Sequence, residues 1–144
     1  MEAKEKTMIT VQVIINASPE VVWQKWTSPE DIVRWNHASV DWQTTWAKND
    51  LHKGGKFTSR MEPKDGSAGF DFEGIYDVIK VNEYIEYHLE DGRKVTITFT
   101  ADNNDQQTKV VETFDPETIN PFEMQQTGWQ AILDNFRKYV ETGQ

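Results

Sequence analysis

The chain has 144 residues, 37% of them hydrophobic and 12% aromatic, which suits one domain with a buried core. We expect a single domain over residues 1–144 with its core between about residues 7 and 141. The net charge of −9 disfavours nucleic-acid and anionic-membrane partners, because phosphate binding needs a concentrated basic surface. No apolar run approaches the roughly 18 residues that span a bilayer, and no apolar signal region follows the charged first residues, so we expect no membrane insertion and a cytoplasmic location. The absence of cysteine excludes disulfides and thiolate nucleophiles.

Residues 8–17 are rich in β-branched side chains and predict a strand with one buried face. Ser18-Pro19-Glu20 and Ser28-Pro29-Glu30 then repeat one helix-start signal, with a serine cap, a proline at the first helical position and an acid in the first turn. Two consecutive short helices are therefore predicted, and they need a sheet to pack on because helices of this length are unstable alone. Their apolar residues are Val22, Trp23, Trp26, Ile32, Val33 and Trp35.

Between Val40 and Phe114, alternating apolar residues predict six further strands. Because no helix separates these strands, we expect neighbours to be antiparallel. Gly74 predicts a bulge or sharp bend within its strand, and Asp91-Gly92 predicts a hairpin. The expected shared faces are Val40, Trp42, Thr44 and Trp46 in one strand, and Phe57, Ser59 and Met61 in the next.

The segment from Asn120 to Val140 predicts one long helix, with Asn120 as N-cap, Pro121 at the first helical position and Glu123 as a capping-box acid. If it continues through Glu141, the helix is about 30 Å long at about 1.5 Å per residue, enough to cross a small sheet. Its expected buried face comprises Trp129, Ile132, Leu133, Phe136 and Val140.

Three segments resemble the helix-grip superfamily of START-like domains, polyketide cyclases and the C-terminal domain of activators of the Hsp90 ATPase. They are Ala17 to Trp23, Phe70 to Val81 with its internal Phe72-Glu73-Gly74, and Gln125 to Phe136. The closing segment is the most distinctive and resembles the Hsp90-activator branch. The likeness extends from about Thr7 to Val140, whereas the stretch from Arg34 to Ser39 departs from a Trp-Trp-Gly-Pro-like sequence common in relatives.

The resemblance implies an α+β fold in which a curved, antiparallel, seven-stranded sheet wraps around a long C-terminal helix, with two short helices after the first strand. The space between sheet and helix often takes an apolar ligand in this superfamily, so binding of a small hydrophobic molecule is our leading prediction. Two alternatives stay open: interaction with an Hsp90-type chaperone, and a polyketide-cyclase-like enzyme acting in the cavity. Fold alone does not decide among them.

Aromatic side chains dominate the expected cavity wall, and rigid rings with few polar groups favour a flat or acyl-like small molecule. The predicted ligand-binding residues are Trp35, His37, Trp42, Met61, Phe72, Trp129 and Leu133. We assign no catalytic residue, and we expect no cofactor. No metal site is expected either, because His37, His52 and His88 lack the spacing of a zinc site.

Two residues would form an acid-base pair if the chain were an enzyme, namely His37 and Glu112. Glu112 shares strand parity with Val110 and Phe114, which would bury it and raise its pKa. If Val111 faces inward instead, Glu112 is exposed, and we favour that arrangement. His88 is expected in solvent, and Asp71 and Glu73 are expected to face away from the interior.

Overall fold

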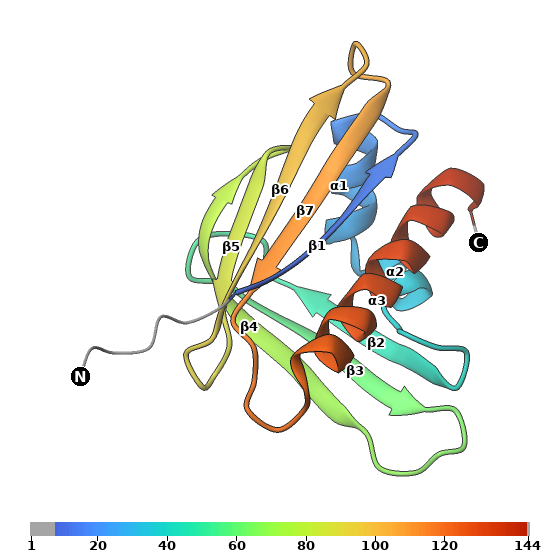
Figure 1. The fold of residues 1–144 in the computed structure, drawn as a ribbon, viewed down its shortest axis with the longest axis vertical. Helices are drawn as coiled ribbons and strands as arrows, with labels where there is room; N and C mark the ends of the chain where they lie inside the picture. The colour runs from blue at the N-terminus through green and yellow to red at the C-terminus, as the bar shows by residue number, and fades with distance from the viewer. Residues whose placement is uncertain (1–7, 144) are drawn as a thin grey trace.

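The computed structural model describes residues 8–143 and shows a curved sheet with one long helix across its concave face (Figure 1). The strands are β1 (Ile9–Ile15), β2 (Trp42–Asn49), β3 (Lys56–Pro63), β4 (Phe70–Lys80), β5 (Tyr84–His88), β6 (Lys94–Asp102) and β7 (Gln107–Phe114). The helices are α1 (Pro19–Thr27), α2 (Pro29–Trp35) and α3 (Phe122–Thr142). The predicted α+β helix-grip fold is confirmed.

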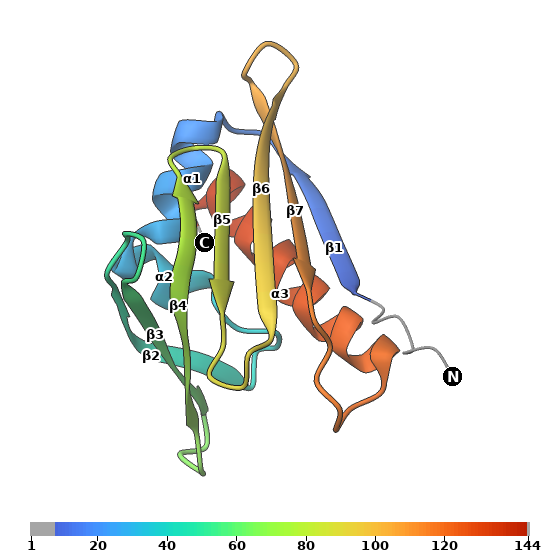
Figure 2. The same cartoon turned by 90° about the vertical axis from the view of Figure 1, so that its left-hand side faces the viewer.

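All neighbouring strands are antiparallel, in the order β1-β7-β6-β5-β4-β3-β2. The first strand therefore pairs with the last, and helices α1 and α2 connect one edge of the sheet to the other. Figure 2 shows β4, β5, β6, β7 and β1 running side by side, with α3 on the far side of the sheet. This connection leaves α1 and α2 beside the open end of the curl, where they help to enclose its interior.

The two short helices begin as predicted, although only one cap is closed by a side chain. Ser18 Oγ accepts a hydrogen bond from the Val21 amide at 3.4 Å, whereas Ser28 ends α1 and starts α2 without a side-chain cap bond. Trp26 of α1 and Trp35 of α2 lie with ring centroids 4.8 Å apart, and both contact Phe136 of α3. This aromatic contact ties the short helices to the long one.

Helix α3 packs on β1, and buried residues of both belong to one hydrophobic core that includes residues of β6 and β7. Leu133 and Phe136 are fully buried, and the other predicted apolar positions of α3 pack partly buried against the same core. The strand residues beneath them that are almost completely excluded from solvent include Ile9, Val11, Ile15, Val95, Ile97, Val110 and Phe114. Burial of this apolar surface supplies the main driving force for folding.

The start of α3 differs from the prediction. Helix α3 begins at Phe122, with Pro121 in the N-cap position and no side-chain cap bond, so Asn120 and Glu123 do not cap it. Asn120 belongs instead to the preceding turn, because the Glu117 carboxylate accepts hydrogen bonds from its backbone amide and its Nδ2. The buried Gln125 side chain joins the first turn of the helix to this loop, donating to the Asn120 carbonyl at 2.8 Å.

Strands β2 and β4 each change register once, and the shift in β2 was not predicted from the alternation. A register shift lies between Thr44 and Ala47 of β2, so Thr44 is buried while Trp46 is 41% exposed, and Val40 precedes the strand and is 77% exposed. The expected common face of these residues is therefore wrong. In β4 the irregularity lies between Tyr76 and Val78, close to Gly74, where a bulge or bend was predicted.

Candidate ligand-binding site

A cavity of about 250 Å³ lies inside the curl, between the sheet and all three helices. Its walls are mainly aromatic and aliphatic, and three of its polar contributors are Ser59, Asn36 and Glu112. The lining residues from the helices and the C-cap of α2 are Trp26, Ile32, Trp35, Asn36, Trp129 and Ile132. The sheet contributes Lys48, Phe57, Ser59, Met61, Phe70, Phe72, Tyr76, Ile85, Tyr87 and Glu112.

Aromatic contacts hold the walls in place. Trp129 of α3 stacks on Phe114 at a centroid separation of 3.8 Å and meets Phe72 edge-on at 6.2 Å. Phe57 of β3 contacts the rings of Phe72 and Tyr87 at 5.9 and 4.6 Å. Gly74 leaves room for Phe57, since a Cβ at this position would lie 2.6 Å from Phe57 Cε2. The walls are thus rigid rings that fix one another around the hollow.

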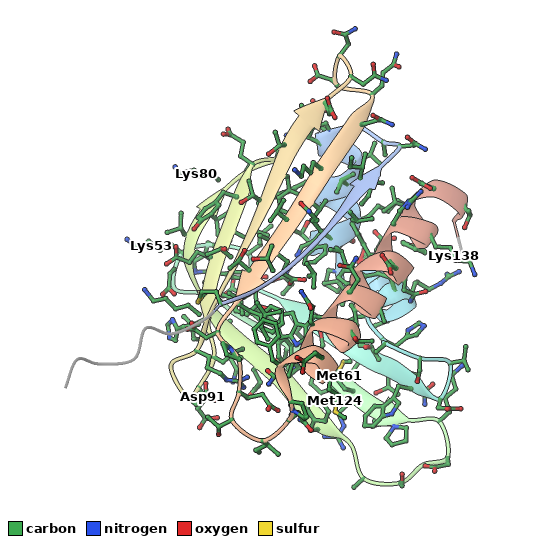
Figure 3. All side chains as sticks on the ribbon, viewed as in Figure 1. Lys53, Met61, Lys80, Asp91, Met124 and Lys138 are labelled. Carbon is green, nitrogen blue, oxygen red and sulfur yellow. The ribbon has the colours of Figure 1, made fainter. Side chains whose placement is uncertain are left out.

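The cavity reaches solvent on the side of strands β2 to β4. Two of its lining residues are exposed there, Lys48 on β2 and Phe70 on β4, and Phe70 is 50% exposed. Figure 3 shows Met61 on the inner side of the sheet near α3, while Lys53, Lys80 and Lys138 extend from the outside of the molecule. The hollow is therefore open to solvent on this side.

Glu112 lies on the concave face of the sheet, and the arrangement we favoured from the sequence is wrong. Its strand neighbours are Val11 on β1 and Ile97 on β6, both almost fully buried, and Glu112 itself is 6% exposed. Val111 points to the other face. Burial raises the pKa of the Glu112 carboxyl to about 8, because the charged form loses its hydration. At neutral pH the group is therefore mostly protonated.

Tyr87 is the second polar group deep in the cavity wall. Its side chain is 7% exposed, and burial raises its pKa well above the ordinary value, with a further contribution from the nearby Glu112 charge. Within residues 8–143, neither the Tyr87 hydroxyl nor the Glu112 carboxyl makes a hydrogen bond to protein. The neighbouring Tyr76 differs, because its hydroxyl donates to Asn49 Oδ1 at 2.6 Å.

The structure gathers four of the predicted binding residues in the cavity wall, Trp35, Met61, Phe72 and Trp129. The other three lie outside that wall. Leu133 is fully buried in the packed core, and Trp42 contacts the ring of the cavity residue Phe70 at 6.1 Å. His37 packs against α3.

His37 is held by Asn135 of α3. Asn135 Nδ2 lies 3.1 Å from His37 Nε2 and also donates to the Trp35 carbonyl at 2.8 Å. Since Nε2 then accepts, the proton sits on Nδ1, which is buried without a partner. Burial and the charge of Lys64 lower the pKa of His37. His37 does not line the cavity that contains Glu112, so the structure does not bring the suggested acid-base pair together there.

The remaining charged residues considered from the sequence lie on the outer surface. Asp71 pairs with Arg60 at 3.2 Å, and Glu73 pairs with Lys56 at 3.0 Å. His88 is partly exposed and lies 2.9 Å from Asp77. Among the described residues 8–143, no group of three or more His, Cys, Asp or Glu side chains is placed to hold a metal ion.

The sequence reasoning did not select Tyr87, Phe57 or Ser59 as site residues. Period-two spacing does place each of them on the same face as a buried apolar neighbour, such as Ile85 for Tyr87 and Met61 for Ser59. Period-two spacing shows which face of a strand is buried. It does not show whether that face borders a cavity or a packed core.

Comparison with known proteins agrees with this fold. The model of the family described as Activator of Hsp90 ATPase homolog 1-like protein matches residues 16–141. The chain belongs to this family. The predicted resemblance to the Hsp90-activator branch is thereby confirmed. A search of curated proteins found no match.

Several solved structures resemble the chain over nearly its whole length. The AHSA1-like protein from Aeromonas hydrophila is 44% identical, with 95% of this chain and 94% of that one covered and a TM-score of 0.87. Chr148 from Cytophaga hutchinsonii is 50% identical, with 94% and 92% covered and a TM-score of 0.79. The Aha1 dimer from Colwellia psychrerythraea shares the fold at 17% identity, with 96% and 98% covered and a TM-score of 0.74. No helix within residues 8–143 is long and apolar enough to cross a membrane.

Proposed function

We propose that this protein binds a small, largely apolar molecule in the cavity between the sheet and α3. The observation that carries the proposal is a hollow of about 250 Å³ whose walls are interlocking aromatic rings. An apolar protein cavity of roughly 150 Å³ accommodates benzene, so this volume suits a larger, two-ring molecule. Trp35, Met61, Phe72 and Trp129 would supply the contacts, and Phe70 would border the entrance.

A two-ring hydrocarbon, 2-ethylnaphthalene, is a suitable probe. Titration followed by amide chemical shifts in NMR spectra is expected to perturb residues of the cavity wall and to give a saturable dissociation constant. The variant Ser59→Leu fills part of the hollow, because Ser59 is 4% exposed and lines it. We expect this variant to weaken binding by about tenfold or more, as each factor of ten corresponds to about 1.4 kcal/mol.

Ser39→Leu is the matched control, because Ser39 is exposed and lies outside the cavity. It makes the same chemical change without altering the hollow, so it is expected to bind the probe as the unmodified chain does. Equal probe binding by both variants, or no saturable binding by the unmodified chain, would contradict the proposal.

A second candidate function is interaction with a chaperone of the Hsp90 type, as the family's name suggests. The specific observation in its favour is a short exposed apolar segment at the start of α3, where Ile119 is 86% and Met124 59% exposed. Exposed apolar side chains close together are typical of protein contacts. Such a partner also accords with the cytoplasmic location that we propose.

The two functions separate experimentally. If the exposed segment carries the activity, the double change Ile119→Asp and Met124→Asp reduces stimulation of an Hsp90-type ATPase, while Ser59→Leu leaves it unchanged. Absence of any stimulation by the unmodified chain removes the second candidate and leaves the cavity proposal intact.

A further inference from the structure

Glu112, Tyr87 and Ser59 are buried polar residues of the cavity wall whose side chains make no hydrogen bond to protein within residues 8–143. Glu112 and Tyr87 are the two of them that titrate. Their placement is unusual, because buried polar groups are almost always paired. Both line one cavity whose remaining wall is largely aromatic. Such unused donors are expected where a ligand supplies the missing acceptor.

The two groups reach the cavity from strands on either side of β6. Glu112 of β7 is opposite Ile97, and Ile97 is opposite Ile85 on β5, two residues before Tyr87. Both side chains line the same cavity, and the Glu112 charge contributes to raising the pKa of Tyr87. Both therefore present polar groups to a largely apolar hollow.

Their protonation states determine what they can bind. Burial raises the pKa of Glu112 to about 8, so at neutral pH its carboxyl is mostly protonated and can donate a hydrogen bond. Tyr87 is also protonated and can donate. The other titratable groups in the wall are Tyr76, whose hydroxyl is already donated to Asn49, and Lys48, which is exposed at the opening.

We propose that Glu112 and Tyr87 together donate hydrogen bonds to the carbonyl oxygen of a flat aromatic ketone or similar neutral carbonyl compound. A carbonyl oxygen has two lone pairs and can accept from both groups at once. A cationic ligand fits less well, because Glu112 is the sole acid lining the cavity within the described residues and ionises there only at the expense of its hydration. This inference rests on the proposed function and specifies the chemistry of its ligand.

Three probes with one two-ring frame test it: 2-acetylnaphthalene, 2-ethylnaphthalene and 1-(2-naphthyl)ethylamine. The ketone is expected to bind about tenfold more tightly than the hydrocarbon at pH 7, the size of effect that a well-placed hydrogen bond supplies. Because the ketone binds the protonated acid, its affinity stays constant below about pH 8 and falls above it. The hydrocarbon shows no such fall.

Variants assign the effect to the two residues. Glu112→Leu is expected to fold, since it removes an unpaired buried acid, and to erase the preference for the ketone. Glu112→Gln retains a hydrogen-bond donor that does not titrate. This variant is therefore expected to keep the preference for the ketone over the hydrocarbon, and its affinity for the ketone should no longer fall above about pH 8. Tyr87→Phe is expected to reduce the preference by several-fold and to leave hydrocarbon binding unchanged.

The outcomes distinguish this inference from the proposed binding of an apolar molecule, on which it rests. If the hydrocarbon binds in the cavity and the ketone binds no more tightly, the inference is overturned and the binding function stands. If the amine binds most tightly, with an affinity that rises with pH, the carboxylate is the anchor and the inference is overturned. If none of the probes binds, the binding function itself fails.

Discussion

The two halves of the concave face are filled in different ways. Leu133 and Phe136 of α3 have no exposed surface and belong to the hydrophobic core that also contains residues of β1, β6 and β7. Trp129 and Ile132 of α3 instead line a hollow of about 250 Å³, to which β3, β4 and β5 supply most of the sheet residues. One sheet and one helix thus provide a packed core and a cavity side by side, and stability and binding are assigned to different residues.

Glu112 lies at the boundary between these halves, and it gives the largest expected effect. Its carboxyl has a pKa of about 8 when folded against an ordinary 4.5, a gap worth roughly 5 kcal/mol at about 1.4 kcal/mol per unit. Between these two pKa values the folded state keeps a proton that the unfolded state releases. The contribution of this proton to the free energy of unfolding is complete below about pH 4.5 and is lost as the pH rises to about 8.

Urea unfolding of the unmodified chain and of Glu112→Gln, at about pH 5 and about pH 9, measures this difference. Between about pH 5 and about pH 9, the free energy of unfolding is expected to fall more for the unmodified chain than for the variant, by up to roughly 5 kcal/mol. If the free energy of unfolding changed equally with pH in the unmodified chain and in Glu112→Gln, Glu112 would not be buried in solution.

The packed and hollow halves are compared directly by two identical truncations. Phe136→Ala is expected to destabilise the fold by about 4 kcal/mol, because it leaves a new cavity in a filled core. Phe72→Ala is expected to cost about half as much, since Phe72 is only partly buried and already borders empty space. Urea midpoints measured under one condition provide the test. Equal losses would mean that the two halves are packed alike.

The sequence predicted much of the packed half because its signals are local and periodic. The face of α3 containing Leu133 and Phe136 follows from helical spacing, and β6 and β7 follow from alternation around good turn residues. The start of α3 was misplaced because Glu117, a residue outside the helix, satisfies Asn120. Cap assignment from sequence does not include such contacts.

The hollow half was less predictable for a physical reason. Aromatic and aliphatic residues at buried positions give the same pattern whether they meet one another or border a void. The prediction therefore selected the wall residues Phe72 and Trp129 but also Leu133, which lies in the packed core. Glu112 was misassigned because burial of an unpaired acid is unfavourable, and the more favourable parity was preferred. Register shifts in β2 and β4 likewise depend on neighbouring strands.

The smallest expected effect is at Gly74, on the hollow side. In Gly74→Ala the new Cβ would lie 2.6 Å from Phe57 Cε2, but the Phe57 ring can shift toward the adjacent cavity. We expect a loss of about 1 kcal/mol, at the low end for overpacking, together with weaker binding of 2-ethylnaphthalene. A loss as large as that of Phe136→Ala would show that Phe57 has no space to move.

A high-resolution structure of the protein with 2-acetylnaphthalene tests the central claim most directly. The account predicts that the probe occupies the hollow between Phe57 and Trp129, with its carbonyl oxygen within hydrogen-bond distance of Glu112. A structure in which the aromatic side chains close over the same space, with no probe between sheet and helix, would contradict it.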